Sequence, residues 1–205
     1  SSSSSSSVAV AAAAAAAACA SSGVSPTAAS RAALAAANSQ AAAARAVTSD
    51  PRATVIARIA ALAVLGRLRA RRGEEGVWTF LDEARDLAAQ AGALRTIAPA
   101  RARAEAAWIE GRNDDAAREA AAPAAQAVAG WQTWFAAELL MWQRLAAADT
   151  SPMPAICADH PCALEATGHW REAAEAWRAC GCPFETARAL MQGDESAQRE
   201  ALATL

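Results

Sequence analysis

Apolar residues recur along most of the chain with the spacing of amphipathic helices. One stripe repeats every three or four residues and lies on a single helix face: Val55, Ile59, Leu62, Leu65 and Leu68. No stretch shows the sustained alternation with β-branched residues that indicates a strand. The pattern therefore predicts an all-α protein without a sheet.

Glycine, proline and capping residues divide this pattern into short and medium helices. Asp50-Pro51 and Gly130 each open a helix, and Asn113 caps another, which Pro123 should kink or split. The expected helices span about 27–47, 51–72, 77–91, 95–110, 113–129, 130–148, 161–167, 169–180, 183–192 and 194–205. Residues 149–161 form a proline-rich connector between two groups of helices.

The first 26 residues differ from the rest, since a serine tract is followed by a nearly unbroken alanine tract. We interpret residues 1–26 as a low-complexity or unregistered segment and residues 27–205 as one helical-repeat domain. A lipoprotein signal ending near Cys19 is an alternative, but no basic residue precedes the tract and alanine inserts weakly into membranes. No other stretch has 18 uninterrupted apolar residues, so we expect no transmembrane helix.

Charge and cysteine content narrow the class of protein. The net charge is −2 and the chain contains no lysine, so no strong field draws it to nucleic acid or to an anionic membrane. Arginines alternate with acidic residues, which predicts solvated helix faces. The last turns of the helix that ends before Gly73 contain Arg67, Arg69, Arg71 and Arg72, and cations are favoured at this end of the helix dipole. An odd count of five cysteines favours reduced thiols and a cytoplasmic location.

A repeat signal runs from Gly168 to Cys180, with aromatic residues at Trp170 and Trp177 and a small residue at Ala173 between them. Glycine permits a tight turn between helices, the aromatic rings fill the space between paired helices, and alanine lets two backbones approach. Weaker copies follow Gly73 and Gly111 at irregular intervals. The expected fold is a set of antiparallel helical hairpins stacked as a TPR-like α-solenoid.

The stretch from Trp170 to Leu202, including Gly-Cys-Pro-Phe-Glu at 181–185, resembles the helical region near the end of large bacterial LuxR-type regulators. The resemblance extends over about residues 55–205 and implies a TPR-like segment of a larger signalling ATPase. That family also has a nucleotide-binding module and a DNA-binding helix-turn-helix. The present sequence has no phosphate-binding loop ending in Lys-Ser/Thr, and no helix-turn-helix follows Leu205 in it, so neither ATP hydrolysis nor DNA binding is expected of this stretch.

Candidate catalytic and metal-ligating groups are few. Cys157, His160 and Cys162, with His169, Cys180 and Cys182, have zinc-ligand chemistry, but their spacing fits no standard zinc site. Packing of small thiols between helices explains them better. We expect no catalytic residue, no cofactor and no bound metal. A metal-dependent or Cys/His enzyme and a secreted TPR lipoprotein stand as the alternatives.

The most suggestive candidate site is an aromatic stripe on the helix after Gly130. Trp131, Trp134 and Trp142 share one side with Glu138. A carboxylate among aromatic rings either pairs with an arginine of a neighbouring helix or lines a binding groove. We therefore expect a non-enzymatic scaffold whose candidate interaction groove takes a protein partner or another domain of the parent protein.

Overall fold

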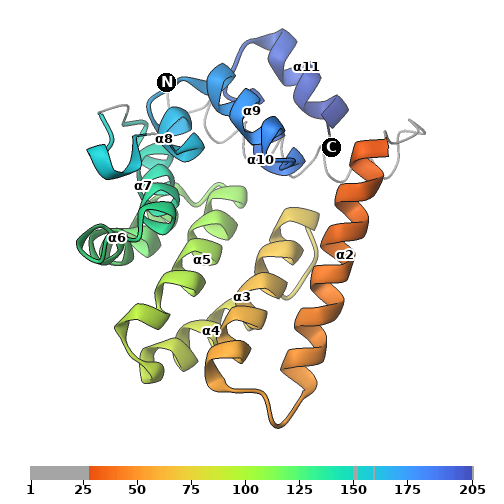
Figure 1. The fold of residues 1–205 in the computed structure, drawn as a ribbon, viewed down its shortest axis with the longest axis vertical. Coiled ribbons are helices and arrows are strands. Elements are labelled where there is room, and N and C mark those ends of the chain that lie inside the picture. Colours follow the sequence, from red (N-terminus) through yellow and green to blue (C-terminus); the bar gives the residue numbers. More distant parts are fainter. Residues whose placement is uncertain (1–27, 150–151, 159, 205) are drawn as a thin grey trace.

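The computed structural model describes residues 28–149, 152–158 and 160–204 (Figure 1). Within these ranges the protein is helical and contains no strand, which confirms the all-α prediction. The low-complexity segment 1–26, with Cys19, lies outside the described residues. The elements are α2 (Ala28–Ser49), α3 (Val55–Arg72), α4 (Val77–Ala91), the 3-10 turn η1 (Ala93–Arg95), α5 (Ile97–Ile109), α6 (Asn113–Ala129), α7 (Thr133–Ala147), the 3-10 turn η2 (Ala155–Cys157), α8 (Pro161–Ala166), α9 (Trp170–Ala179), α10 (Pro183–Leu190) and α11 (Glu195–Thr204).

Each helix packs on the next along the chain, and α5 also contacts both α3 and α7. Figure 1 shows α2 to α7 following one another across the molecule, with α8 to α11 lying across one end. The N-terminal half of α2 approaches the C-terminal end of α11, so the beginning and end of the described chain lie near one another. No helix in the described ranges is both long and apolar enough to cross a membrane.

The predicted start of α3 at Asp50-Pro51 is wrong by several residues. The helix begins at Val55, and the Thr54 side chain caps it by accepting the N–H of Ala57 at 3.2 Å. Asp50 instead stabilises the preceding turn, since its carboxylate accepts the N–H of Arg52 at 2.8 Å. Short polar side chains commonly accept a backbone N–H in this way, either in a turn or at the start of a helix. Here Thr54, which lies closer to the apolar stripe than Asp50, is the residue that caps the helix.

Three further details of α6 and α7 bear on the prediction. Pro123 lies inside α6 without dividing it. It lines an open pocket, where the carbonyl that it leaves without an amide partner can be solvated. Asn113 is the first residue of α6 and not its cap, and α7 begins at Thr133, three residues after Gly130.

The centre of the fold is α5, which is buried on nearly all sides. Its interior positions are mostly alanine, and so are the facing positions of α6, which allows the backbones to approach closely. Helices α3 and α4 also approach closely where they cross, because a Cβ on Gly66 would overlap the side chain of Leu81. Small residues therefore allow the helices to approach closely at these crossings.

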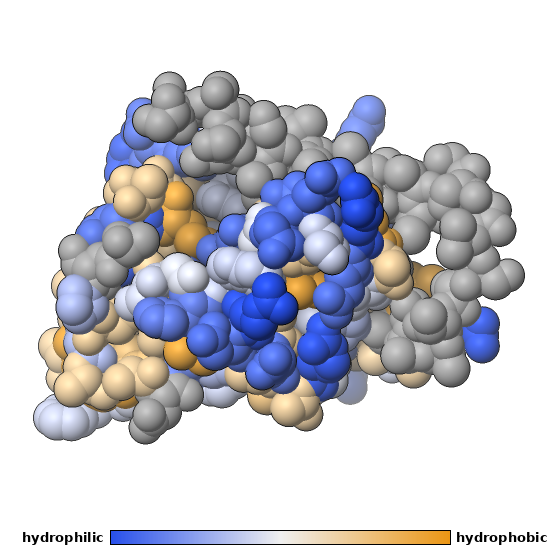
Figure 2. Space-filling model, turned by 90° about the horizontal axis from the view of Figure 1, so that it is seen from above, coloured by the Kyte–Doolittle hydropathy of each residue, from blue (hydrophilic) through white to orange (hydrophobic). Residues whose placement is uncertain are grey.

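The four short C-terminal helices lie where the sequence predicts them. In α9, Ala173, Ala174 and Trp177 are buried while the charged side chains of that helix face solvent. Figure 2 views the molecule from this end and shows hydrophilic side chains gathered across the middle of the face, with smaller hydrophobic areas between them. Trp177 packs toward α8 and α10, the partners expected from the repeat motif.

Candidate functional site

The four residues of the predicted groove do not line one surface. Trp142 is fully buried, with its ring centroid 5.4 Å from that of Trp108, and Glu138 is buried as well. Trp131 and Trp134 lie at the surface, with exposed fractions of 80% and 50%. The stripe therefore divides into two core residues and two surface residues.

Trp131 has a backbone conformation that glycine adopts at three comparable helix ends. Gly111, Gly168 and Gly181 have φ values of 75°, 82° and 69°, and each donates its N–H to the carbonyl three residues earlier. Trp131 makes the same bond with φ of 54°, while the neighbouring Gly130 has φ of −87°, which any residue adopts. A left-handed conformation costs a non-glycine residue about 1–2 kcal/mol. An exposed Trp131 recovers little of that cost through packing.

Two more aromatic residues extend this surface along the first turn of α7. Trp134 meets the imidazole of His160 edge-on, with centroids 4.0 Å apart, and Phe135 is stacked under the guanidinium of Arg101 at 4.8 Å. We call Trp131, Trp134 and Phe135 the aromatic patch. The inner edges of Trp134 and Phe135 are fixed by packing, so the patch presents its outer faces from a rigid base.

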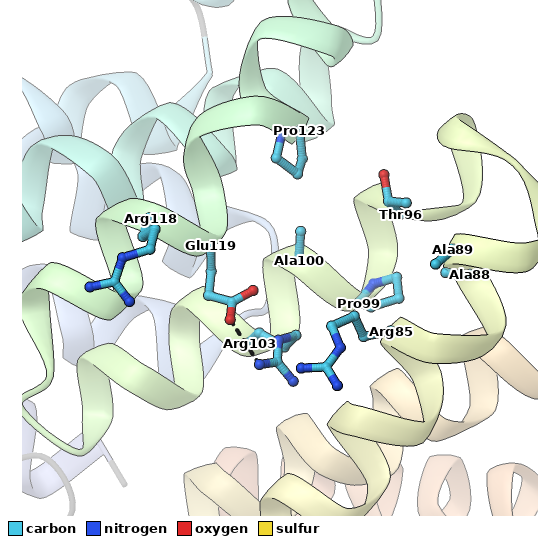
Figure 3. Close-up of a pocket in the computed structure, with 10 residues that line it drawn as sticks. All are labelled: Arg85, Ala88, Ala89, Thr96, Pro99, Ala100, Arg103, Arg118, Glu119 and Pro123. Atoms are coloured by element: carbon cyan, nitrogen blue, oxygen red, sulfur yellow. Dashed lines mark hydrogen bonds and ion pairs between the residues drawn. The ribbon is translucent and has the colours of Figure 1, made fainter.

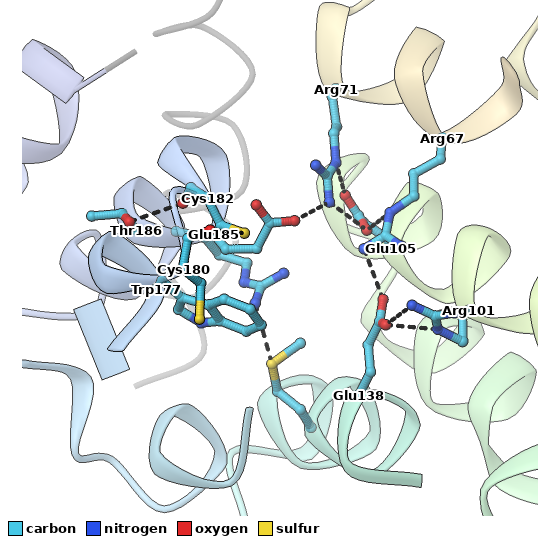
Figure 4. Close-up of polar contacts among 12 residues, drawn as sticks. Arg67, Arg71, Arg101, Glu105, Glu138, Trp177, Cys180, Cys182, Glu185 and Thr186 are labelled. Atoms are coloured by element: carbon cyan, nitrogen blue, oxygen red, sulfur yellow. Dashed lines mark hydrogen bonds and ion pairs between the residues drawn. The ribbon is translucent and has the colours of Figure 1, made fainter. Parts of the chain in front are cut away.

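Glu138 is held between arginines from two neighbouring helices (Figure 4). Arg67 of α3 donates Nη2 to one carboxylate oxygen at 2.7 Å, and Arg101 of α5 donates Nε to the other at 2.6 Å. Burial alone raises the pKa of Glu138, but the guanidiniums of Arg67 and Arg101 outweigh it and lower that pKa to about 2. Of the two placements that the sequence left open, arginine pairing is the one observed.

The same arrangement continues from α3 to α10. Arg67 and Arg71 each place Nε 2.5 Å from a different oxygen of Glu105, whose side chain is completely buried. Arg71 also donates Nη2 to Glu185 at 2.7 Å. With Arg101 and Glu138, these residues form the buried ion-pair network of Figure 4. The general expectation that arginines cover solvated helix faces is wrong for Arg67 and Arg71, because both turn inward to meet Glu105.

A second buried pair lies among the C-terminal helices. Arg188 donates Nε and Nη2 to the two oxygens of Glu165 at 2.9 and 2.6 Å, and both side chains are almost completely buried. Trp177 donates its indole N–H to the same carboxylate at 2.6 Å, and Gln192 adds a bond at 3.1 Å. The expectation that charged residues cover solvated faces therefore fails here too.

An open groove of about 520 Å³ lies between α2, α3 and the start of α10. We call it the α2–α3–α10 groove. Its walls include Leu34 of α2, Val64 and Leu68 of α3 and Phe184 of α10, and its polar residues include Arg67, Arg71, Arg72 and Glu185. The sequence alone does not reveal this groove, because its walls come from opposite ends of the chain.

A second, smaller pocket of about 380 Å³ lies between α4, α5 and α6 (Figure 3). Arg85 and Arg103 approach one another there, and Arg103 donates to Glu119 at 2.8 Å and to Asp82 at 2.6 Å. Its other arginine, Arg118, pairs with an aspartate outside the pocket. The acidic partners compensate the arginines, so this pocket has no net attraction for an anion.

The cysteine and histidine residues are dispersed among different environments. His160 accepts the N–H of Cys162 at Nδ1 over 3.1 Å, and burial lowers its pKa to about 4, so its ring is neutral at pH 7. Burial raises the pKa of the Cys162 thiol well above its usual value, which opposes thiolate formation. In the described ranges no three His, Cys, Asp or Glu side chains are grouped for a metal ion.

Comparisons of the chain with protein-family models, with curated proteins and with solved structures found no match. The candidate sites are therefore judged on their own geometry.

Proposed function

We propose that this chain is a non-catalytic helical-repeat scaffold that mediates protein–protein or intramolecular regulatory interactions in the cytoplasm. The proposal has two parts, a TPR-like repeat architecture and an interaction surface at the aromatic patch.

The helix contacts support the repeat architecture. Helices α3, α5 and α7 contact one another in succession, while α4 and α6 each pack on the helices before and after them. Such a pattern is typical of stacked helical hairpins, in which every hairpin contacts only its neighbours. The comparable turns after α5, α8 and α9, each with glycine in the left-handed conformation, also suit a repeated unit.

The observation that carries the interaction surface is Trp131. At its turn a glycine stands one position too early, and a large, exposed aromatic residue takes the left-handed conformation. No contact within the described chain offsets the cost of that conformation, whereas burial of a tryptophan against a partner would offset it. Tryptophan is enriched among the residues that dominate binding energy in protein interfaces. Trp134 and Phe135, both partly exposed in the next turn of the chain, add apolar area for the partner.

Replacement of Trp131 by glycine tests this interpretation because stability and binding should change in opposite directions. Trp131→Gly should raise the free energy of unfolding by about 1 kcal/mol, since it relieves the left-handed residue. The same variant should lose capture of protein partners from an extract of the source organism. Leu94→Ala is the matched control, since Leu94 is an exposed apolar residue outside the patch and its loss should leave capture unchanged.

Two outcomes would count against the proposal. A less stable Trp131→Gly variant would mean that Trp131 packs within its own chain. Equal capture by the wild type and by Trp131→Gly would mean that the patch is not the interaction surface.

The resemblance to LuxR-type regulators favours a role inside such a multidomain protein. The aromatic patch would then contact either another domain of the parent protein or a separate partner. The reading frame that encodes this chain tests the assignment: a nucleotide-binding module upstream and a helix-turn-helix downstream are expected, and their absence would reject it.

A further inference from the structure

The α2–α3–α10 groove has chemistry that the interaction surface does not use. Three arginines and one glutamate contribute charge to its lining: Arg67, Arg71, Arg72 and Glu185. The acidic partners behind this lining, Glu105 and Glu138, are sealed from solvent, with side-chain exposures of 0% and 6%. Arg72 in turn pairs with Glu74, so the carboxylates around the groove balance the charge of its arginines. What the groove offers an anion is therefore guanidinium hydrogen-bond donors and not a net positive field.

The two central guanidiniums are fixed in position. Arg67 and Arg71 approach opposite oxygens of one carboxylate, that of Glu105, so they lie side by side. Each uses Nε and Nη2 in the buried ion-pair network, and among the described residues no hydrogen bond involves Nη1 of either one. Two rigid, adjacent groups with donors to spare match the two oxygens of an additional carboxylate.

The remaining walls are mostly apolar, and their large apolar side chains come from three helices. Leu34 of α2 faces Val64 and Leu68 of α3 across the groove, and Phe184 lies beside the guanidinium of Arg71, whose central carbon is 4.0 Å from the ring centroid. The volume of about 520 Å³ is in the range of small-molecule sites, which combine mostly apolar walls with a few convergent polar groups.

We propose that this groove binds an organic acid with an extended apolar body. Its carboxylate lies against Nη1 of Arg67 and Arg71, and its apolar body lies along Leu34, Val64, Leu68 and Phe184. This site is separate from the aromatic patch, so the proposal does not depend on the protein interface.

Calorimetric titration of the full chain with three probes tests the ligand class. Sodium decanoate, below its micelle concentration, should bind saturably with one site per chain. Decanol retains the apolar body without the charge, and acetate retains the charge without the body, so each should bind at least tenfold more weakly. Absence of saturable decanoate binding, or equal affinity for decanoate and decanol, would reject the site.

A charge placed on the groove wall tests the location without disturbing the network beneath. Leu34→Glu puts a carboxylate on the wall, and because Leu34 is 57% exposed the variant should fold normally. It should weaken decanoate binding at least tenfold. Leu94→Glu is the matched control, as Leu94 is 60% exposed and lies outside the groove, and its affinity should equal that of the wild type. If both variants bind decanoate equally well, the ligand occupies another part of the protein.

Discussion

The buried pair of Arg188 and Glu165 allows a quantitative prediction about stability. Both side chains are almost completely removed from water, and each satisfies the other through two hydrogen bonds. Removal of one partner leaves a buried, uncompensated charge, which costs about 3–5 kcal/mol. Arg188→Met and Glu165→Leu should therefore each lower the free energy of unfolding by about that amount.

The double variant should lose far less unfolding free energy than the two single variants lose together. With both charges replaced by apolar groups, the main remaining cost is the indole N–H of Trp177, which loses its acceptor. An unsatisfied buried donor costs about 1–3 kcal/mol. The two singles sum to roughly 6–10 kcal/mol, so the cycle predicts a coupling energy of at least about 3 kcal/mol between Arg188 and Glu165.

Equilibrium unfolding in urea measures all four proteins of this cycle. The midpoints should order as wild type, double variant and then the two singles, with similar slopes. If the double variant loses as much stability as the two singles together, the pair is not buried as a unit and the reasoning fails.

Three other outcomes follow from single positions. Trp177→Ala should lower the free energy of unfolding in urea by about 3–5 kcal/mol, because it empties a buried space between helices. Glu175→Ala at the surface should lower it by only a few tenths of a kcal/mol. Equal shifts of the urea midpoint would contradict the packing of α9. Gly66→Ala should lower thermal stability by about 1–3 kcal/mol, because the new methyl group collides with Leu81, and an unchanged melting temperature would rule out the close crossing. Because the pKa of Glu138 is lowered to about 2, its stabilising contribution is complete above its usual pKa and is lost as the pH falls from about 5 toward 2; in acid titrations followed by circular dichroism, Glu138→Gln should be less stable at pH 7 and less sensitive to pH over that interval.

The helices could be predicted from the sequence because their signals are local. Gly73, Gly92 and Gly111 each follow a helix, as expected, and proline opens α8 and α10. Errors arose where two local signals compete, as at the start of α3. The TPR-like stacking remains a proposal, since a repeat motif identifies neighbours more readily than it fixes their arrangement.

The sites were harder to predict because they depend on contacts between distant parts of the chain. Glu138 pairs with Arg67, 71 residues earlier, and Glu185 pairs with Arg71, 114 residues earlier. One signal was present: Arg67 and Arg71 lie one turn apart and adjoin the apolar stripe of α3, which is an unusual place for solvated charges. The sequence signal for the conformation of Trp131 was weaker. In the comparable turns a glycine occupies the left-handed position, whereas here Gly130 stands one residue before it.

The composition of the core explains why this fold contains so many buried charges. Alanine buries little apolar area, and a surface of alanine methyl groups distinguishes poorly between one helix register and the next. Arginine and glutamate side chains are long enough to connect α3 with α7 and with α10. Their charges are paired only when the two residues lie at matching positions along the axes of the helices. Their net contribution to stability is small, because desolvation offsets most of the attraction, but a wrong register would leave charges buried without partners. We therefore infer that the small residues permit the close approach of the helices, and that the ion pairs select the register in which that approach occurs.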